Sequence, residues 1–345
     1  MSYEQDAPRE PLSVGRAVAI VLAVLLNLAL LAVLAFVAFN PQRLIDQVAV
    51  WQYEPTAAIA SYADRSSMTD EGRFMFYASR PKVESGDAFD EICAAHVEDV
   101  GVLGCYVHSS KRIHLYDVTD DRLDGIEDVV AAHEMLHAVW DRMSTEERRR
   151  ITALLEAEVA ARGDDTELAS TLAFYAEAEP GQRANELHSI LGTEYADLGE
   201  ELEAHYATYF ADRGDLVALH ARSNAVFVEQ RAAIDALVAR LDELHAAIEA
   251  DYASYNAGYD ELNANILDFN ARAEAGDFDS YSQFNRERGE LMSRQAELDA
   301  LYVSIDARVT EYDTLVAELD DLNAQVDELN QSINIAPRPE SGIDP

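Results

Sequence analysis

The sequence has little positive charge and almost no lysine. Its 345 residues include 26 Lys and Arg against 65 Asp and Glu, which gives a net charge of -39 at pH 7. Only Lys82 and Lys111 are lysines, so nearly all the basic residues are arginines. A surface of this charge repels phosphate groups, which excludes nucleic acid as a partner. The charge is typical of a heavily solvated surface and does not by itself indicate a binding site.

Cysteine is also scarce, because the chain has only Cys93 and Cys105. Outside the cytoplasm these two could form a disulfide that closes a short loop and stabilises the fold by roughly 3 kcal/mol. Inside the cytoplasm they would be two buried free thiols. The compartment decides between the two states, so both stay open at this point.

One long run lacks charge altogether. Residues 17–39 read AVAIVLAVLLNLALLAVLAFVAF, with Asn27 as the one polar residue. A helix of this length is roughly 34 Å long, which is enough to cross the core of a lipid bilayer. A cleavable signal peptide has a shorter apolar run of about 7–15 residues, so we expect an uncleaved membrane anchor. Arg9 and Arg16 precede the run and Arg43 follows it, and this slight bias places the rest of the chain outside the cytoplasm.

The part after the apolar run is predicted to be an α+β, mainly helical domain at residues 41–214. β-prone residues predict three short strands, at residues 73–77, 100–108 and 112–118. The last two strands form a hairpin, so we expect a small antiparallel sheet. Asp124 with Glu127 is a capping box that predicts the start of a helix. Further helices are predicted at residues 144–162, 166–179, 183–191 and 198–212. The polar ends of the chain are predicted to be disordered, at residues 1–16 and 335–345.

The last third of the chain has heptad periodicity. Apolar residues recur three and four positions apart from Ile234 to Phe269 and again from Tyr312 to Ile333, which is the spacing of a coiled-coil seam. Residues 275–280 (AGDFDS) interrupt the pattern. We therefore predict an antiparallel coiled-coil hairpin at residues 215–334, with arms of roughly 80–90 Å. The hairpin would extend away from the domain, gate the cleft of that domain, or contact a second copy of the chain or an envelope partner.

The strongest chemical signal is the segment VVAAHEMLHAVWD, residues 129–141. His133 and His137 are four residues apart, so on a helix they face the same way and can bind one ion. Glu134 would lie beside that ion without being a ligand. The apolar residues on the same helical stripe are Ile126, Val129, Val130 and Trp140. The two histidines should therefore point into the domain, where unpaired imidazoles are costly and a metal removes that cost. The alternative is two hydrogen-bonded core histidines without a metal.

A catalytic zinc site has three protein ligands and keeps one position for water. The segment NELHS, residues 185–189, offers Glu186 or His188 as the third ligand. These two residues are two positions apart on a predicted helix, so they point to different faces. Because the chain is rich in acid, Glu186 could also be an ordinary surface glutamate.

Two segments resemble a known family. HEMLHAVWD is similar to the active-site helix of thermolysin-like gluzincins, and NELHS resembles their Asn-Glu-x-x-Ser helix. The resemblance implies that His133, His137 and Glu186 bind Zn²⁺ and that Glu134 is the base that activates water. It also implies that the strand at residues 112–118 is an edge strand that pairs with an extended peptide substrate.

The resemblance covers only these two short helices, and it leaves two roles unassigned. The acid that usually follows the second motif is Ile190 here, so Glu194 or Asp141 would orient the first histidine. Hydrolysis of a peptide bond also needs a hydrogen-bond donor that stabilises the oxyanion developing on the attacked carbonyl. For this role we choose Tyr206 from the segment AHYATYFADR. The alternative for Tyr206 is aromatic packing against the domain.

The sequence therefore predicts a membrane-anchored zinc peptidase. A zincin-like domain at residues 41–214 would face the outside and cleave a protein or peptide substrate, while residues 17–39 contact the lipid bilayer. The alternative is an inactive zincin-like scaffold in a coiled-coil envelope assembly. The presence of Glu134 favours the enzyme, because a structural zinc site does not need a base.

Overall fold

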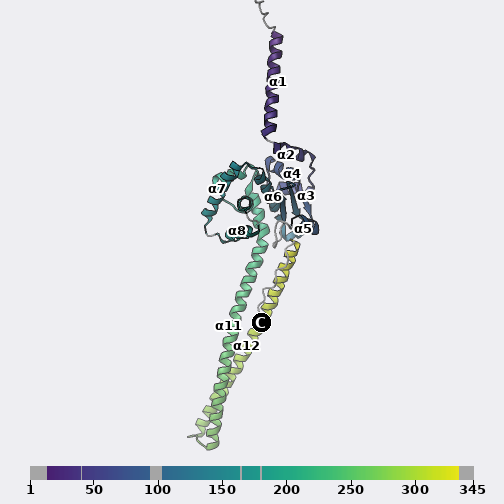
Figure 1. Cartoon of the computed structure of the whole chain (residues 1–345). Helices are drawn as coiled ribbons and strands as arrows, with labels where there is room; N and C mark the ends of the chain where they lie inside the picture. Colours follow the sequence, from purple (N-terminus) through teal and green to yellow (C-terminus); the bar gives the residue numbers. More distant parts are fainter. Residues whose placement is uncertain (1–13, 40, 94–102, 164, 179–180, 334–345) are drawn as a thin grey trace, which may run out of the picture. The chain divides into compact units, whose positions relative to one another are not determined.

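The structure is a computed structural model that describes residues 14–39, 41–93, 103–163, 165–178 and 181–333 (Figure 1). The described residues fall into two compact units. The first lies within Met1–Glu98, Val102–Asp117 and Gly125–His220, and the second within Asp99–Gly101, Val118–Asp124 and Ala221–Pro345. The predicted disordered ends lie outside the described residues, except that residues 14–16 begin the first helix.

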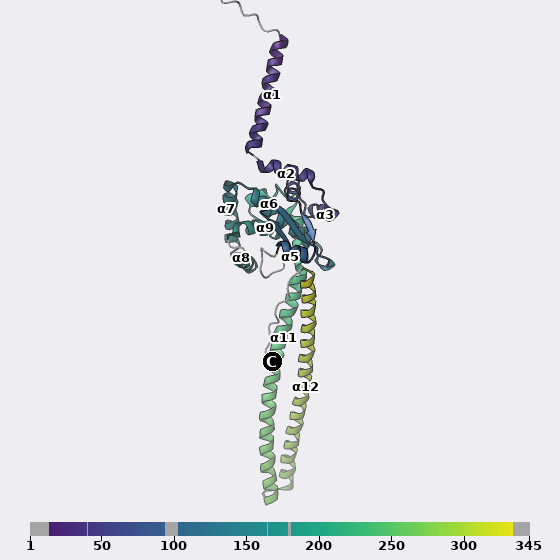
Figure 2. The same ribbon diagram turned by 45° about the vertical axis from the view of Figure 1, so that its right-hand side comes forward.

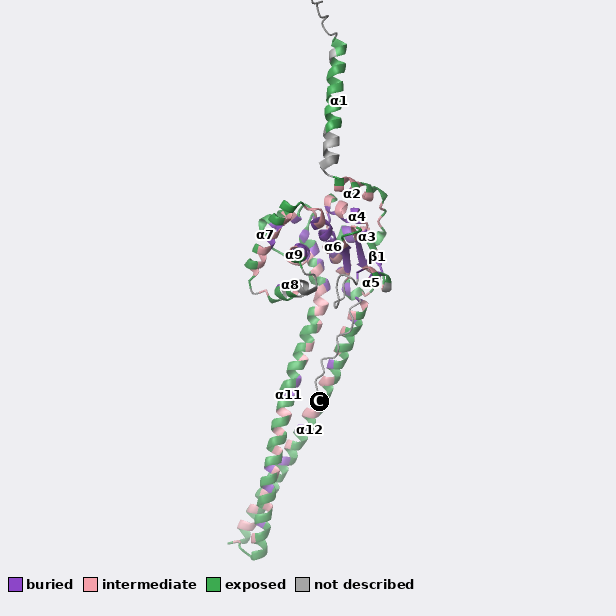
Figure 3. Ribbon diagram, viewed as in Figure 1, coloured by how far each residue is buried: buried purple, intermediate pink, exposed green. Residues whose placement is uncertain are grey.

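Helix α1, Val14–Phe39, contains the apolar run and begins three residues before the predicted start. Its segment Val14–Leu31 has a mean hydropathy of 2.4 and is the one candidate membrane span among the described residues. The side chains described along this segment are exposed, as Figure 3 shows. The helix is therefore long and apolar enough to cross a membrane, a criterion that signal sequences also meet.

Three short helices follow, and one of them corrects a predicted strand. They are α2 (Pro41–Gln52), α3 (Ala57–Arg65) and α4 (Asp70–Ala78). Residues 73–77 lie inside α4, so the strand predicted there is wrong. The Thr69 side chain caps this helix by accepting a hydrogen bond from the Gly72 N–H. This cap and the burial of Phe76 outweigh the β-propensity of the aromatic residues.

The sheet has three strands in the order β1-β3-β2. They are β1 (Lys82–Glu84), β2 (Gly104–Val107) and β3 (Arg112–Tyr116). The hairpin of β2 and β3 is confirmed as antiparallel, but β1 pairs with β3 in parallel, so the sheet is mixed and the antiparallel prediction is wrong. Because β1 occupies the other side of β3, the strand at residues 112–118 is central. The expected role of this strand as the substrate-binding edge is therefore also wrong, and β2 lies at the edge.

A disulfide joins Cys93, the last residue of helix α5 (Asp87–Cys93), to Cys105 in β2. Both cysteines are buried and pack with Phe89. The sequence left open whether these cysteines are free or paired, and in the structure they are paired. The bond ties α5 to the edge strand of the sheet.

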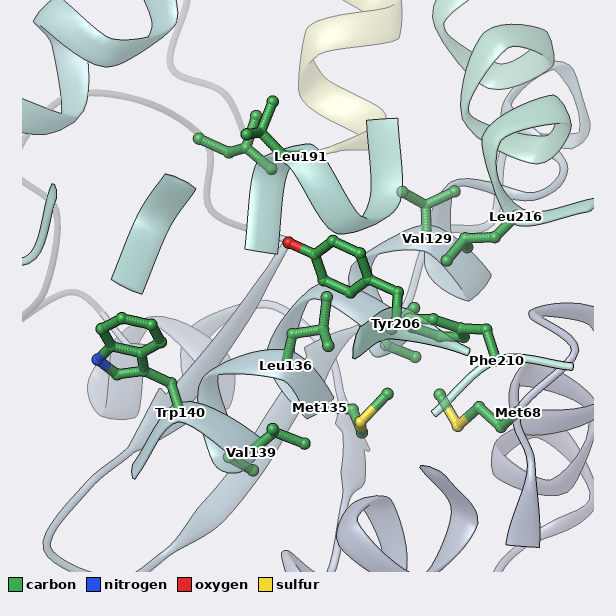
Figure 4. Packing of buried hydrophobic residues seen from close by; sticks show 14 of the residues in the cluster. Met68, Val129, Met135, Leu136, Val139, Trp140, Leu191, Tyr206, Phe210 and Leu216 are labelled. Atoms are coloured by element: carbon green, nitrogen blue, oxygen red, sulfur yellow. The ribbon is translucent and has the colours of Figure 1, made fainter. Parts of the chain in front are cut away.

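In the first unit, α6 (Ile126–Arg142) is buried along most of its length and packs against α3, α4, the sheet and one of the later helices, α9 (Arg183–Glu194). The other later helices are α7 (Thr145–Arg162), α8 (Thr166–Ala178) and α10 (Glu200–Tyr206). Figure 4 shows apolar side chains from several of these elements, with Leu136 from α6 beside Tyr206. The four later helices predicted from periodicity are confirmed, although α10 is shorter than predicted.

The start of α6 differs from the predicted capping box. Its N-cap is Gly125, which has φ of 101° and makes no side-chain capping bond. Glu127 instead accepts a hydrogen bond of 2.7 Å from the Tyr62 hydroxyl on α3. Asp124 ends the short 3₁₀ turn η1, Asp121–Leu123. A contact from a distant segment therefore takes the place of the local cap.

In the second unit, two long helices pack side by side (Figure 2). They are α11 (Arg213–Ala275, 63 residues) and α12 (Tyr281–Ser332, 52 residues), and residues 276–280 join them. Leu241, Leu262, Leu298 and Ile305 are among their buried residues. The heptad prediction of two long helices that pack together is confirmed. α11 runs without a break through the predicted domain boundary at residue 214.

Candidate metal site

The candidate site is built on α6 and α9. His133 and His137 lie one turn apart on α6, and their ring centroids are 4.7 Å apart with an interplanar angle of 77°. Their side chains are only 14% and 10% exposed. The buried α6 therefore turns both imidazoles inward, as its apolar stripe predicts.

Glu186 on α9 reaches both imidazoles. Its Oε2 lies 3.8 Å from His133 Nε2, and its Oε1 lies 3.6 Å from His137 Nε2. These distances are longer than hydrogen bonds. Two ligand atoms on a tetrahedral zinc, each about 2.0–2.1 Å from the metal, are about 3.4 Å apart. The two distances are close to that value, and each involves a different oxygen of Glu186.

His137 is held by two further residues of α9. Its Nδ1 lies 3.0 Å from Asn185 Oδ1 and 3.2 Å from Ser189 Oγ. The amide oxygen of Asn185 can only accept a hydrogen bond, so Nδ1 carries the proton. The other ring nitrogen, Nε2, faces Glu186. This arrangement is typical of a histidine prepared to bind a metal.

Glu134 is buried and lies against the edge strand β2. A Cβ atom added to Gly104 would be 2.8 Å from Glu134 Cγ, which shows how closely the strand approaches this side chain. Glu134 can also place a ligand atom within 4.8 Å of those of His133 and His137, so it competes with Glu186 for the role of third ligand. Glu186 is the other candidate, because its two oxygens each approach one Nε2. Glu134 thus lies beside the histidine pair.

His188, the alternative third ligand, is occupied elsewhere. It is fully buried, and its Nε2 lies 2.9 Å from His205 Nε2. Its ring packs 5.4 Å from that of Trp140. Burial and the neighbouring imidazole of His205 lower the pKa of His188 well below its usual value, so the ring is neutral. The structure therefore brings Glu186, and not His188, to the histidine pair.

Tyr206 is not brought to the pair. Its side chain is fully buried, and its hydroxyl donates a hydrogen bond of 2.7 Å to the His188 carbonyl. Figure 4 shows its ring among apolar residues such as Leu136 and Phe210. The prediction that Tyr206 donates to an oxyanion is corrected, because the hydroxyl is already used within the core. Tyr206 instead packs as an aromatic side chain in the core, which was the alternative that the sequence offered.

The two predicted orienting acids have different surroundings. Asp141 accepts hydrogen bonds from the Tyr106 hydroxyl at 2.9 Å and from Lys111 Nζ at 2.5 Å, which ties the end of α6 to the β2–β3 hairpin. Glu194 lies 4.0 Å from Nε2 of His220 on α11. Burial lowers the pKa of His220, and the nearby His133 lowers it further. His220 is thus near the site although no motif marks it in the sequence.

Sequence reasoning missed Asn185, Ser189 and Gly104 as parts of the site. Asn185 and Ser189 belong to the NELHS segment, and their separation of four residues could have indicated that they share a helix face. Gly104 had no signal, because its importance comes from the approach of a distant helix. No family model, no curated protein and no solved structure matches this chain, so the site rests on its own residues and geometry.

Proposed function

We propose that this chain is a zinc-dependent peptidase, similar to gluzincins, that α1 anchors to a membrane. The observation that carries the proposal is the position of the Glu186 carboxylate, 3.8 Å from His133 Nε2 and 3.6 Å from His137 Nε2. Two imidazoles and one carboxylate are the donor set of a catalytic zinc centre.

The surroundings of these three residues fit a divalent ion. The buried His137 and Glu186 and the partly buried His133 face one another at distances longer than hydrogen bonds, and Asn185 orients one imidazole. When bound there, Zn²⁺ would supply a Lewis acid that acidifies water and polarises a carbonyl. His133, His137 and Glu186 would hold it.

Glu134 supplies the proton transfer. Its carboxylate accepts a proton from the attacking water and then donates that proton to the leaving amine, which is general base and general acid catalysis in turn. Burial of Glu134 against β2 keeps the carboxylate in a narrow range of positions. A buried base next to the reacting bond is what amide hydrolysis needs at neutral pH.

The edge strand β2 offers a place for an extended peptide. Gly104 is opposite Leu115 in β3, and the Tyr116 N–H donates to the Leu103 carbonyl. This pattern makes Gly104 and Leu115 a non-hydrogen-bonded pair, so the N–H and C=O of Gly104 point away from β3. Among the described strands, none lies on that side. A substrate strand can therefore pair with β2 by β-augmentation.

Two features support a location outside the cytoplasm. The apolar helix α1 precedes the domain and is long enough to span a bilayer. The Cys93–Cys105 disulfide is typical of proteins in oxidising compartments. The substrate class that follows is a protein or peptide outside the cytoplasmic membrane.

The test is a Glu134→Gln variant of the full chain in detergent. We expect the wild-type chain to bind near-stoichiometric zinc and to cleave an unfolded protein. Glu134→Gln should keep the zinc and lose cleavage by about 10²–10⁴-fold. Glu146→Gln, at an exposed position on α7, is the control and should cleave normally.

Each other outcome has a defined meaning. Cleavage that survives Glu134→Gln contradicts the proposed mechanism. Zinc binding without cleavage by the wild type favours the inactive scaffold. A chain that binds no zinc refutes both.

A further inference from the structure

We propose that Gly104 is a positioning residue: because it has no side chain, β2 lies directly against Glu134 and determines where the Glu134 carboxylate is held. The inference rests on the proposed function, in which Glu134 is the base. It adds a residue on a separate element that controls this base without touching the metal ligands.

The space at Gly104 is too small for a methyl group. A Cβ atom there would lie 2.5 Å from Val130 Cγ1, 2.8 Å from Glu134 Cγ and 3.1 Å from Glu134 Oε1. Carbon atoms that are not bonded to each other prefer separations of about 3.5–4.0 Å. Two of the three contacts involve the side chain of Glu134, so any added atom would act on it.

Backbone conformation does not explain the glycine. The described glycines with positive φ are Gly86, Gly125, Gly163, Gly181 and Gly276. Gly104 is not among them and lies in a strand conformation that any residue can adopt. A glycine within a strand is unfavourable, because it loses more conformational freedom than other residues. The close approach to α6 is the reason that remains.

The neighbours of Gly104 have little freedom to move. Val130 is β-branched and on a helix, which leaves it one strongly preferred rotamer. β2 is paired with β3, and the residue after Gly104 is Cys105, which is disulfide-bonded to Cys93. Glu134 can therefore relieve a clash only by moving its carboxylate. A methyl group at position 104 should displace the base.

The same glycine lies where the substrate strand would pair. Its N–H and C=O point to the outer edge of β2, while its Cα faces Glu134. A peptide that pairs with this part of β2 is brought next to the carboxylate. Gly104 thus sets the distance between the edge strand and the base.

The first test needs neither metal nor activity. The unfolding temperature of the metal-free full chain is measured in detergent for Gly104→Ala, Glu134→Ala and the double variant. We expect Gly104→Ala to lower this temperature by about 3–8 °C, as overpacking does. In the Glu134→Ala background part of this loss should disappear, because the two contacts with Glu134 are gone while the 2.5 Å contact with Val130 remains. A loss of equal size in both backgrounds would overturn the proposal.

Gly104→Ala could also prevent folding through its contact with Val130. The same cycle is therefore measured in a Val130→Ala background, which removes the 2.5 Å contact and leaves those with Glu134. Coupling between positions 104 and 134 should persist there. Its absence would show that only packing against Val130 matters, and would also refute the proposal.

The second test uses cleavage. We expect Gly104→Ala with Val130→Ala to lower kcat about 10–100-fold relative to Val130→Ala alone, with little change in KM or zinc content. An unchanged kcat would contradict the role of Gly104. If the wild-type chain does not cleave at all, the proposed function fails, while the unfolding cycle still decides whether Gly104 positions Glu134.

Discussion

Asn185 determines how one imidazole is presented. Its amide oxygen lies 3.0 Å from His137 Nδ1, which leaves Nε2 directed to Glu186. The residue is 3% exposed, so water has little access to replace the bond. Neighbours of this kind orient a ligand without touching the metal, and their loss weakens metal binding.

We therefore expect Asn185→Ala to lower the affinity for zinc about 10–100-fold while the fold is kept. Competition with a chromogenic chelator measures this affinity. Asn263→Ala, at an exposed position of α11, is the matched control and should bind zinc normally. An unchanged affinity in Asn185→Ala would mean that the orientation of His137 does not depend on this amide.

A buried carboxylate in the sheet, that of Glu84, predicts a pH effect. Burial by itself would raise the pKa of Glu84, but hydrogen bonds from His114 and Lys82 outweigh burial and lower the pKa. His114 Nδ1 lies 2.9 Å from Glu84 Oε1, and both side chains are buried. A carboxyl whose pKa is lower in the folded state stabilises the fold above its unfolded pKa, and this stability is lost as the pH falls through the folded pKa.

The expected result is that Glu84→Gln destabilises the chain at pH 7 and that the difference from wild type shrinks as the pH falls below about 4. Denaturant unfolding at several pH values measures both. Glu71→Gln changes a half-exposed acid that pairs with Arg43 and should cost less at pH 7. A difference between wild type and Glu84→Gln that does not depend on pH would contradict the assignment.

At the scale of elements, the two long helices use glycine in two ways. Gly258 in α11 is buried, and a Cβ atom there would lie 2.7 Å from Leu298 Cδ2 in α12. Gly289 in α12 is exposed, and nothing lies within 4 Å of a Cβ atom added to it. Glycine inside a helix is about 1 kcal/mol less favourable than alanine. Only the first glycine has a packing reason to be there.

We expect Gly289→Ala to stabilise the pair of helices by up to about 1 kcal/mol, because it gains helix propensity without a clash. Gly258→Ala gains the same propensity but pushes against Leu298, so it should give no stabilisation or a loss. Thermal unfolding followed by circular dichroism compares the two. Equal stabilisation by both variants would show that the close approach at Gly258 is not needed.

At the scale of the whole molecule, metal binding should stabilise the fold. The donors come from α6 and α9, which also form much of the core of the first unit, so an ion held by both opposes unfolding. A ligand that binds only the folded state stabilises it by about 2.7 kcal/mol at a concentration one hundred times its Kd.

We expect removal of zinc with a chelator to lower the unfolding temperature and its return to restore it. Calorimetry of the full chain in detergent measures the shift. The shift should be absent in Glu186→Ala, which removes the only donor from α9 that faces both imidazoles. A shift of normal size in Glu186→Ala would place the ion elsewhere.

The sequence by itself determined the features that depend on local periodicity. The apolar run of α1, the helix that presents His133 and His137 on one face, and the two heptad helices all follow from spacing along the chain. Such patterns are informative because each residue's neighbours on the same face are three or four positions away.

Only the tertiary structure decided what depends on distant segments. Residues 73–77 are helical, β3 is central, and Tyr206 uses its hydroxyl inside the core. The choice of Glu186 over His188 and the closeness of Gly104 to Glu134 come from how α9 and β2 pack against α6. Secondary-structure propensity is a weak preference that packing overrides. The spacing of residues within one segment also does not determine how close that segment lies to another.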